Sequence, residues 1–423
     1  MLRVNTSWAF VGNTVYAGCQ WAVLVLLVNA LSPVEVGTYA YALAVTAPIF
    51  VLAGFRLRHV LATAVASPGD FRDYLATRLL TTACALFASL AIGAFSTSSR
   101  ETVIVIVLVA LARSCDAVSD ICHGLFQRDL DMRSAAAGLT INGVASVLLV
   151  EAALVYWQSL PLAAVGYAAG SWIALVSWDL PRAARMLNGP GERSAKHQTW
   201  AAVRSLLVRA LPLGLSSAVN SIQTNLPRYA IASLLGPAPL AVFAAISQIP
   251  LLGHLAVNAA SQAALPQLAK DARLLRGSYR ARLSGLVASS IGLGAIALLL
   301  TIAVGRRLLG GIYGPGYAEH ASVLSWMMAT AVITFASVFL GAGTVARGRF
   351  GAQLAVSTTS LTVVTASLGP LVLRFGLNGA ACSLLLGSIV ELGAYTVLTV
   401  RDFKREQPTP NLVPHVLAGS MQP

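Results

Sequence analysis

The chain has 423 residues, of which 57% are hydrophobic and only 11% are charged, and its formal net charge is +13. Soluble domains carry about 25% charged residues. This composition excludes a globular domain with a single core and indicates an all-α protein that crosses a membrane many times.

Twelve stretches are long and apolar enough to cross a bilayer, which takes about 20 residues per helix. The fourth is the least apolar, because Arg113 and Asp116 lie inside it; the simplest partner for Asp116 is Arg113 on the same helical face. In chain order the predicted spans cover residues 8–30, 39–61, 79–96, 99–119, 137–157, 160–178, 210–235, 239–262, 283–304, 320–343, 352–373 and 378–400.

The loops between these spans divide the basic residues unevenly. With the N-terminus in the cytoplasm, the outside loops contain only Arg100, Arg306, Arg307 and Arg374. Cytoplasmic loops are rich in Lys and Arg, so we expect both termini in the cytoplasm and take the basic charge as a topology signal, with no nucleic-acid partner. The first apolar stretch lacks a convincing cleavage site and is expected to be retained as a span.

The two halves of the chain resemble each other. The stretch "ALSPVEVGTYAYALAVTAPI" from Ala30 aligns with "LLGPAPLAVFAAISQIPLL" from Leu234 at a shift of 204 residues, which places Pro33 on Pro237. Repeats of this kind form the two lobes of many transporters. We predict two pseudo-symmetric six-helix lobes around a central cavity: an N-lobe (1–180), a cytoplasmic linker (181–209), a C-lobe (210–402) and a cytoplasmic tail (403–423).

Polar residues recur at helical spacing on four predicted spans, two in each half. The stripes run through Asn220, Thr224 and Arg228 in the seventh span and through His254 in the eighth, and the 204-residue shift maps them onto the first two spans. Polar faces in a bilayer point at protein or water, so these residues either line a shared cavity or form interhelical hydrogen bonds. The candidate cavity residues are Asn13, Gln20, Arg56, Arg58, Asn220, Thr224, Arg228, His254, Asn258 and Gln262.

Arg228, in "NLPRYAIASLLG", is the most anomalous of these. No charge precedes it back to Ala210, and the next charged residue is Lys270. An arginine at the centre of a membrane helix costs about 2.5–3.5 kcal/mol, and guanidinium binds phosphate in a bidentate fork. We expect Arg228 to face a hydrated cavity and bind an anionic ligand; snorkelling to the outer interface is the alternative. Arg56 and Arg58 extend the positive lining, or are basic residues at an inner membrane end.

Glu391 and Glu151, within the twelfth and fifth predicted spans, are the candidates for coupling. Each either carries a coupling proton or pairs with a neighbour. The five cysteines are scattered without metal-ligand spacing, so we expect no metal; no cofactor is expected, and without a Walker motif the chain does not hydrolyse ATP.

The stretches "PVEVGTYAYALAVTAPIFVLAGFRLRHVLAT", "SDICHGLFQRDLDMRSAA" and "NLPRYAIASLLG" with "LAVFAAIS" resemble bacterial polysaccharide flippases of the Wzx type, in the multidrug/oligosaccharidyl-lipid/polysaccharide exporter superfamily. The resemblance implies a flippase that turns polyprenyl-pyrophosphate-linked oligosaccharide across the bacterial inner membrane by alternating access. It implies that spans 1, 2, 7 and 8 line the cavity. It also makes a polysaccharide polymerase and glycosyltransferases candidate partners, alongside membrane lipids, and we expect a monomer.

Other classes fit less well. A membrane-bound polymerase or ligase is an enzyme alternative, but the longest predicted outer loop, "GRRLLGGIYGPGYAE", leaves little room for a catalytic domain. A purely structural membrane protein has no need of Arg228 or His254. The nearest rival is a cation-coupled multidrug or small-molecule antiporter of the same fold. Drug-exporting relatives commonly carry an acid in span 1, where this chain has none.

Overall fold

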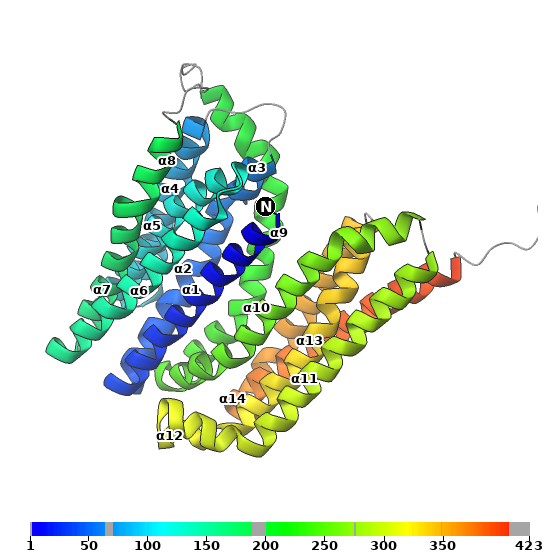
Figure 1. Ribbon diagram of the computed structural model, residues 1–423. Helices are drawn as coiled ribbons and strands as arrows, with labels where there is room; N and C mark the ends of the chain where they lie inside the picture. The colour runs from blue at the N-terminus through cyan, green and yellow to red at the C-terminus, as the bar shows by residue number, and fades with distance from the viewer. Residues whose placement is uncertain are drawn as a thin grey trace, which may run out of the picture.

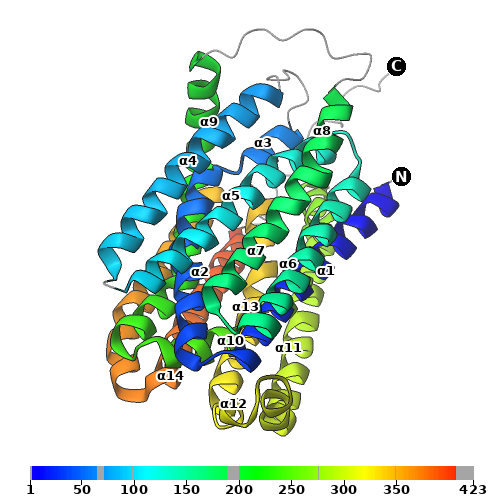
Figure 2. The same cartoon turned by 90° about the vertical axis from the view of Figure 1, so that its left-hand side faces the viewer.

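The computed structural model describes residues 2–63, 71–97, 99–187, 200–274, 276–347 and 349–405. Within these ranges the regular structure is entirely helical, without a strand. Two groups of helices diverge toward the end where the chain begins and meet at the opposite end (Figure 1). Helix α12 (Pro315–Ala318) lies at that opposite end in both views (Figures 1 and 2). The predicted all-α class and two-lobe arrangement are confirmed.

Each lobe is a bundle of long helices. The first half consists of α1 (Leu2–Ala30), α2 (Pro33–Gly54), α3 (Leu57–Thr63), α4 (Phe71–Ser96), α5 (Arg100–Arg128), α6 (Met132–Trp157), α7 (Leu160–Ala174), the π-helix η1 (Leu175–Asp179) and α8 (Leu180–Leu187). The second half consists of α9 (Trp200–Leu234), α10 (Pro237–Leu274), α11 (Arg276–Tyr313), α12, α13 (Ala321–Ala346) and α14 (Phe350–Arg405). Both α8 and the start of α9 fall within the predicted linker, whose residues 188–199 lie outside the described ranges.

The 204-residue repeat reappears in the helix boundaries. Helices α1 and α9 end at Ala30 and Leu234, and α2 and α10 begin at Pro33 and Pro237, so one shift of 204 residues relates both pairs. Proline is favoured in the first helical turn because it lacks the N–H that would be left unpaired there. In α2 the start is fixed further by a capping box between Ser32 and Glu35, which places it before residue 39, the predicted start of that span.

The second predicted span is also interrupted near its end. Helix α2 stops at Gly54, Phe55 and Arg56 adopt left-handed conformations (φ 45° and 50°), and α3 resumes at Leu57. Two adjacent non-glycine residues in this region are strained and need outside support. Phe55 receives it from α9, where it packs so closely on Gly214 that a Cβ there would lie 3.0 Å from the ring.

Ten of the described helices are long and apolar enough to cross a membrane, which identifies a multi-pass membrane protein. Helix α9, which contains the predicted seventh span, is not among the ten. Helix α14 counts once, although non-helical backbone at Gly376 (φ 58°, ψ −132°) divides it into two helices. The predicted spans 352–373 and 378–400 lie on either side of that glycine. Twelve crossings and the domain boundaries stay predictions.

The largest apolar core lies where the lobes meet. It joins Leu27 and Val36 of the first half to Ile231, Leu240 and Leu324 of the second, all nearly inaccessible to solvent. Helices in a bilayer associate through close packing of small residues, and Gly37 of α2 is an example, because a Cβ at this position would overlap the backbone of Pro237 in α10. This junction holds the two halves together at one end and places α9 and α10 against α2.

Candidate functional site

Arg228 lies on α9 at the junction of the lobes. Its Nη1 donates a hydrogen bond to Asn225 Oδ1 (3.0 Å), and its Nη2 lies 3.5 Å from Ser247 Oγ of α10. Among the described residues no carboxylate forms an ion pair with it. A guanidinium has five N–H donors, and the two contacts here are to neutral oxygens, so they do not neutralise the charge of Arg228.

A second arginine, Arg113, approaches from the other lobe. It lies on α5, and its Nε donates to the buried hydroxyl of Thr46 in α2 at 3.0 Å. The positive charges of Arg113 and Arg228 act unfavourably on each other.

The sequence did not single out Arg113 because Asp116 offered a local partner. In the structure, Asp116 accepts a hydrogen bond from Asn142 Nδ2 of α6 at 2.8 Å. Among the described contacts no ion pair within 4 Å joins it to Arg113, although the two opposite charges still attract each other. The signal that could have identified Arg113 is the one used for Arg228, a basic residue inside a predicted span.

Hydrogen bonds close the junction beyond these arginines. The Tyr229 hydroxyl donates to the carbonyl oxygen of Ala44 (2.5 Å), and Trp21 Nε1 donates to the Tyr313 hydroxyl (2.7 Å). Asn29 Nδ2 donates to the carbonyl oxygen of Ile312 (3.1 Å). Each bond joins one lobe to the other, so this end of the molecule is shut.

The predicted polar stripes of α9 and α10 are only partly buried. Asn220, Thr224 and Gln262 are exposed, whereas Asn258 and His254 are partly covered. The imidazole of His254 stacks on Phe335 of α13 within the same lobe, with ring centroids 6.4 Å apart. These positions leave polar groups accessible along α9 and α10, and their role as cavity residues stays a prediction.

The two candidate cavity residues of α1, Asn13 and Gln20, lie in different surroundings. Asn13 is exposed, and its amide donates to its own helix at Ala9. Gln20 instead lies in the interior of the first lobe, where its Oε1 accepts from Tyr167 (3.1 Å) and its Nε2 is buried without a partner among the described atoms. Gln20 is therefore not brought together with Asn220 and Thr224.

Arg56 and Arg58 lie at the break between α2 and α3, and their side chains contact different helices. Arg56 is exposed, and its Nε donates to Ser217 Oγ of α9 at 2.9 Å. Arg58 pairs with Asp120 of α5 at 3.4 Å, and the same carboxylate pairs with the buried Arg78 at 2.8 Å. One acid thus pairs with two arginines, so this group of three side chains carries one net positive charge.

The two candidate coupling acids occupy different environments. Glu391 is partly buried in the second helical segment of α14, whereas Glu151 is exposed on α6. No hydrogen bond or ion pair of either side chain is present among the described contacts. Their part in coupling stays a prediction.

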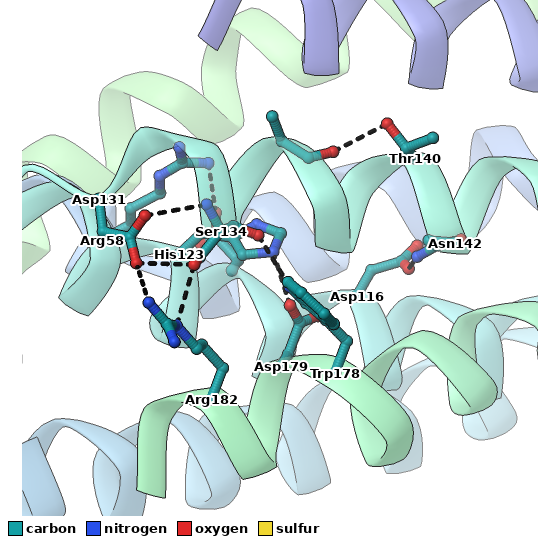
Figure 3. Close-up of polar contacts among 12 residues, drawn as sticks. Arg58, Asp116, His123, Asp131, Ser134, Thr140, Asn142, Trp178, Asp179 and Arg182 are labelled. Carbon is teal, nitrogen blue, oxygen red and sulfur yellow. Dashed lines mark hydrogen bonds and ion pairs between the residues drawn. The ribbon is translucent and has the colours of Figure 1, made fainter. Parts of the chain in front are cut away.

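A further set of polar contacts lies inside the first lobe (Figure 3). His123 Nε2 and Asp179 Oδ1, both buried, are 3.1 Å apart. Asp131 caps α6 through Ser134 and pairs with Arg182 of α8 (2.8 Å). Burial alone would raise the pKa of Asp131, but hydrogen bonds from Ser134 and Arg182 hold it below its ordinary value. These contacts fasten η1 and α8 to α5 and α6. Within the described residues no three His, Cys, Asp or Glu side chains are placed to hold a metal ion.

Comparison with known proteins identifies the family. A profile described as "Polysaccharide biosynthesis protein" matches residues 2–270. The chain belongs to this polysaccharide biosynthesis family. A family relative, the capsular polysaccharide biosynthesis protein CapF of Staphylococcus aureus, is 23% identical over 406 residues, which cover 94% of this chain and 99% of CapF.

Solved structures with the same fold share little sequence with this family member. The lipid II flippase MurJ in an inward closed conformation aligns over 94% of this chain and 89% of its own, with a TM-score of 0.76 and 11% identity. An inward-facing multidrug resistance MATE transporter of the MOP superfamily aligns over 95% and 96%, with a TM-score of 0.66 and 12% identity. At these identities the likeness establishes the fold.

Proposed function

We propose that this protein is a flippase that moves an oligosaccharide, linked through a diphosphate to a polyprenyl lipid, across the membrane for surface polysaccharide synthesis. The observation that carries the proposal is Arg228, a membrane-helix arginine with neutral hydrogen-bond partners at the junction of two lobes. The polysaccharide family supports the sugar part of the ligand, and the likeness to a lipid II flippase supports its lipid part.

The chemistry of such a ligand matches the residues at the junction. A diphosphate has two anionic groups, and Arg228 and Arg113 each supply a guanidinium from a different lobe. The exposed amides and hydroxyls of Asn220, Thr224 and Gln262 offer hydrogen bonds to sugars. Transport, not catalysis, is the proposed activity.

Movement is proposed to be alternating access, with the lobes rocking about the ligand. The closed end bears Tyr229, Trp21 and Asn29. The loop charges support placing this end outside and both termini in the cytoplasm, in a bacterial inner membrane. The described state would then receive lipid-linked oligosaccharide from the cytoplasmic side.

An antiporter for cationic drugs is the second candidate, favoured by the MATE neighbours and by the partly buried carboxylate of Asp116 in the first lobe. Such a ligand requires negative charge at the junction, where Arg228 and Arg113 contribute positive charge.

A flipping assay with purified protein in liposomes distinguishes the flippase from the antiporter. Fluorescent oligosaccharide on a polyprenyl diphosphate should become accessible to an impermeant quencher only when protein is present, and the same sugar on a neutral polyprenol should not. Equal flipping of both lipids, or transport of a cationic dye alone, would contradict the proposal.

A further inference from the structure

A groove of about 840 Å³ runs along the side of the molecule between the lobes. Its walls come from α2, α4 and the start of α5 in one lobe and from α9 and α10 in the other. None of the described residues that line it is charged. The groove therefore lies at the seam that alternating access must open and close.

The lining changes character along the groove. Near the helix ends it is rich in hydroxyl groups, including Thr38, Ser96, Thr102 and Ser233. Farther along it is apolar, with Pro48 and Ile49 on α2 and Leu226 on α9. From Thr38 to Ile49 a helix rises about 16 Å at 1.5 Å per residue, so the groove is long and has one polar end.

This gradient matches a lipid chain with a polar end group. An apolar recess is a poor site for water, because a water molecule needs two to four polar partners. If the recess is empty, its walls lose van der Waals contacts. Hydrocarbon fills the apolar part without either penalty, while hydroxyls at the rim can donate to phosphate oxygens. Ile92 of α4 is 44% exposed in the groove wall and would be covered by such a chain.

The groove adjoins Arg228 through one helix. Tyr229 lines it, and the neighbouring Arg228 contacts Asn225 on α9 and Ser247 on α10. Along α9, Arg228 and the rim residue Ser233 are about 8 Å apart. A lipid whose anionic end lies between them would have its hydrocarbon chain in the apolar part of the groove.

We propose that this groove binds the isoprenoid chain of the carrier lipid during translocation. The inference rests on the proposed function and adds the place of the lipid tail to it. The tail then occupies the seam beside Tyr229, where its presence bears directly on the closure of the two lobes.

Photocrosslinking in nanodiscs tests the groove without any sugar. The full-length protein carries a benzophenone amino acid at Ile92, and the probe is radiolabelled polyprenyl monophosphate in a phosphatidylethanolamine and phosphatidylglycerol bilayer. The matched control carries the benzophenone at Leu373 of α14, 70% exposed and outside the groove. We expect labelling at Ile92 that unlabelled polyprenyl phosphate competes away, and weak labelling at Leu373 that it does not.

The second measurement repeats the photocrosslinking with variants in which a tryptophan fills the groove. Ala230→Trp places an indole in the groove, and Ala366→Trp adds the same group at an exposed position outside it. With benzophenone at Ile92, the first variant should lose the competed labelling and the second should keep it. Labelling equal at Ile92 and Leu373, or unchanged in Ala230→Trp, would show that bulk phospholipid covers the groove and would overturn the proposal. Because the probe has no sugar, competed labelling alongside failed oligosaccharide flipping would reject the proposed function alone.

Discussion

The hydroxyl of Tyr229 on α9 donates a hydrogen bond to the backbone carbonyl oxygen of Ala44 on α2, at 2.5 Å, across the junction of the two lobes. This bond lies one residue from Arg228, so the group that closes the junction and the group proposed to bind the ligand share one helix. Movement of α9 on ligand binding would act on both.

Removing that bond should weaken the closed end. A hydrogen bond of this kind contributes about 0.5–1.5 kcal/mol, so Tyr229→Phe should raise the population of molecules open at this end by about 2- to 13-fold. Spin labels on α2 and α10 would report the change as a longer interlobe distance. Tyr156→Phe, at an exposed tyrosine of α6, serves as the control and should leave the distance distribution unchanged. An unaltered distribution in Tyr229→Phe would show that the bond does not hold the lobes together.

The close approach of α2 and α10 makes a sharper test of the same junction. Any side chain at Gly37 overlaps the backbone of Pro237, whereas Gly18 of α1 has open space around its Cα. Gly37→Ala should therefore prevent closure and abolish transport, while Gly18→Ala should leave transport intact. Flipping assays on both variants, with expression checked by gel filtration, would decide; normal flipping by Gly37→Ala would contradict the packing described here.

The cap at the start of α6 predicts a pH dependence of stability. The folded pKa of Asp131 is depressed, so its contribution is complete above the unfolded value of about 3.9 and is lost as the pH falls through the lower folded value. Asp131→Ala should destabilise the protein by about 1 kcal/mol at neutral pH. Thermal unfolding in detergent should show the difference in stability between the wild type and Asp131→Ala shrinking below about pH 4. A stability difference that grows in acid would contradict the depressed pKa of Asp131.

Orientation can be tested with impermeant thiol reagents on single cysteines in a cysteine-free background. A cysteine at Ser194, outside the described residues, should be protected in intact cells, and one at the exposed Gly311 of α11 should react. The opposite pattern would invert the proposed topology and the direction of transport.

Hydropathy was sufficient to predict the membrane class, because burial in lipid constrains every span, and the 204-residue repeat predicted the two lobes. The repeat superposed Pro33 on Pro237, and α2 and α10 begin at these two prolines, although the predicted spans began a few residues later. The break at Phe55 was missed because its support comes from Gly214, far along the chain. Arg113 was missed for a similar reason: sequence spacing offered Asp116, whereas tertiary packing provides Thr46.

The carboxylate of Glu391 allows a test of coupling that leaves the junction untouched. If this group carries the driving proton, Glu391→Gln should bind lipid-linked oligosaccharide but fail to transport it along a pH gradient. Glu151→Gln, at the exposed position on α6, is the matched comparison. Gradient-driven transport by Glu391→Gln equal to that of the wild type would remove this residue from the mechanism.

The most direct measurement is the flipping of fluorescent oligosaccharide on a polyprenyl diphosphate by liposomes that contain wild-type, Arg228→Ala or Arg228→Lys protein in equal amounts. Both variants should fold, because alanine costs less in a membrane than arginine. Both should lose flipping, the lysine variant because a point charge cannot form the bidentate contact of a guanidinium. Flipping by Arg228→Ala at the wild-type rate would contradict the role of Arg228 in binding the ligand.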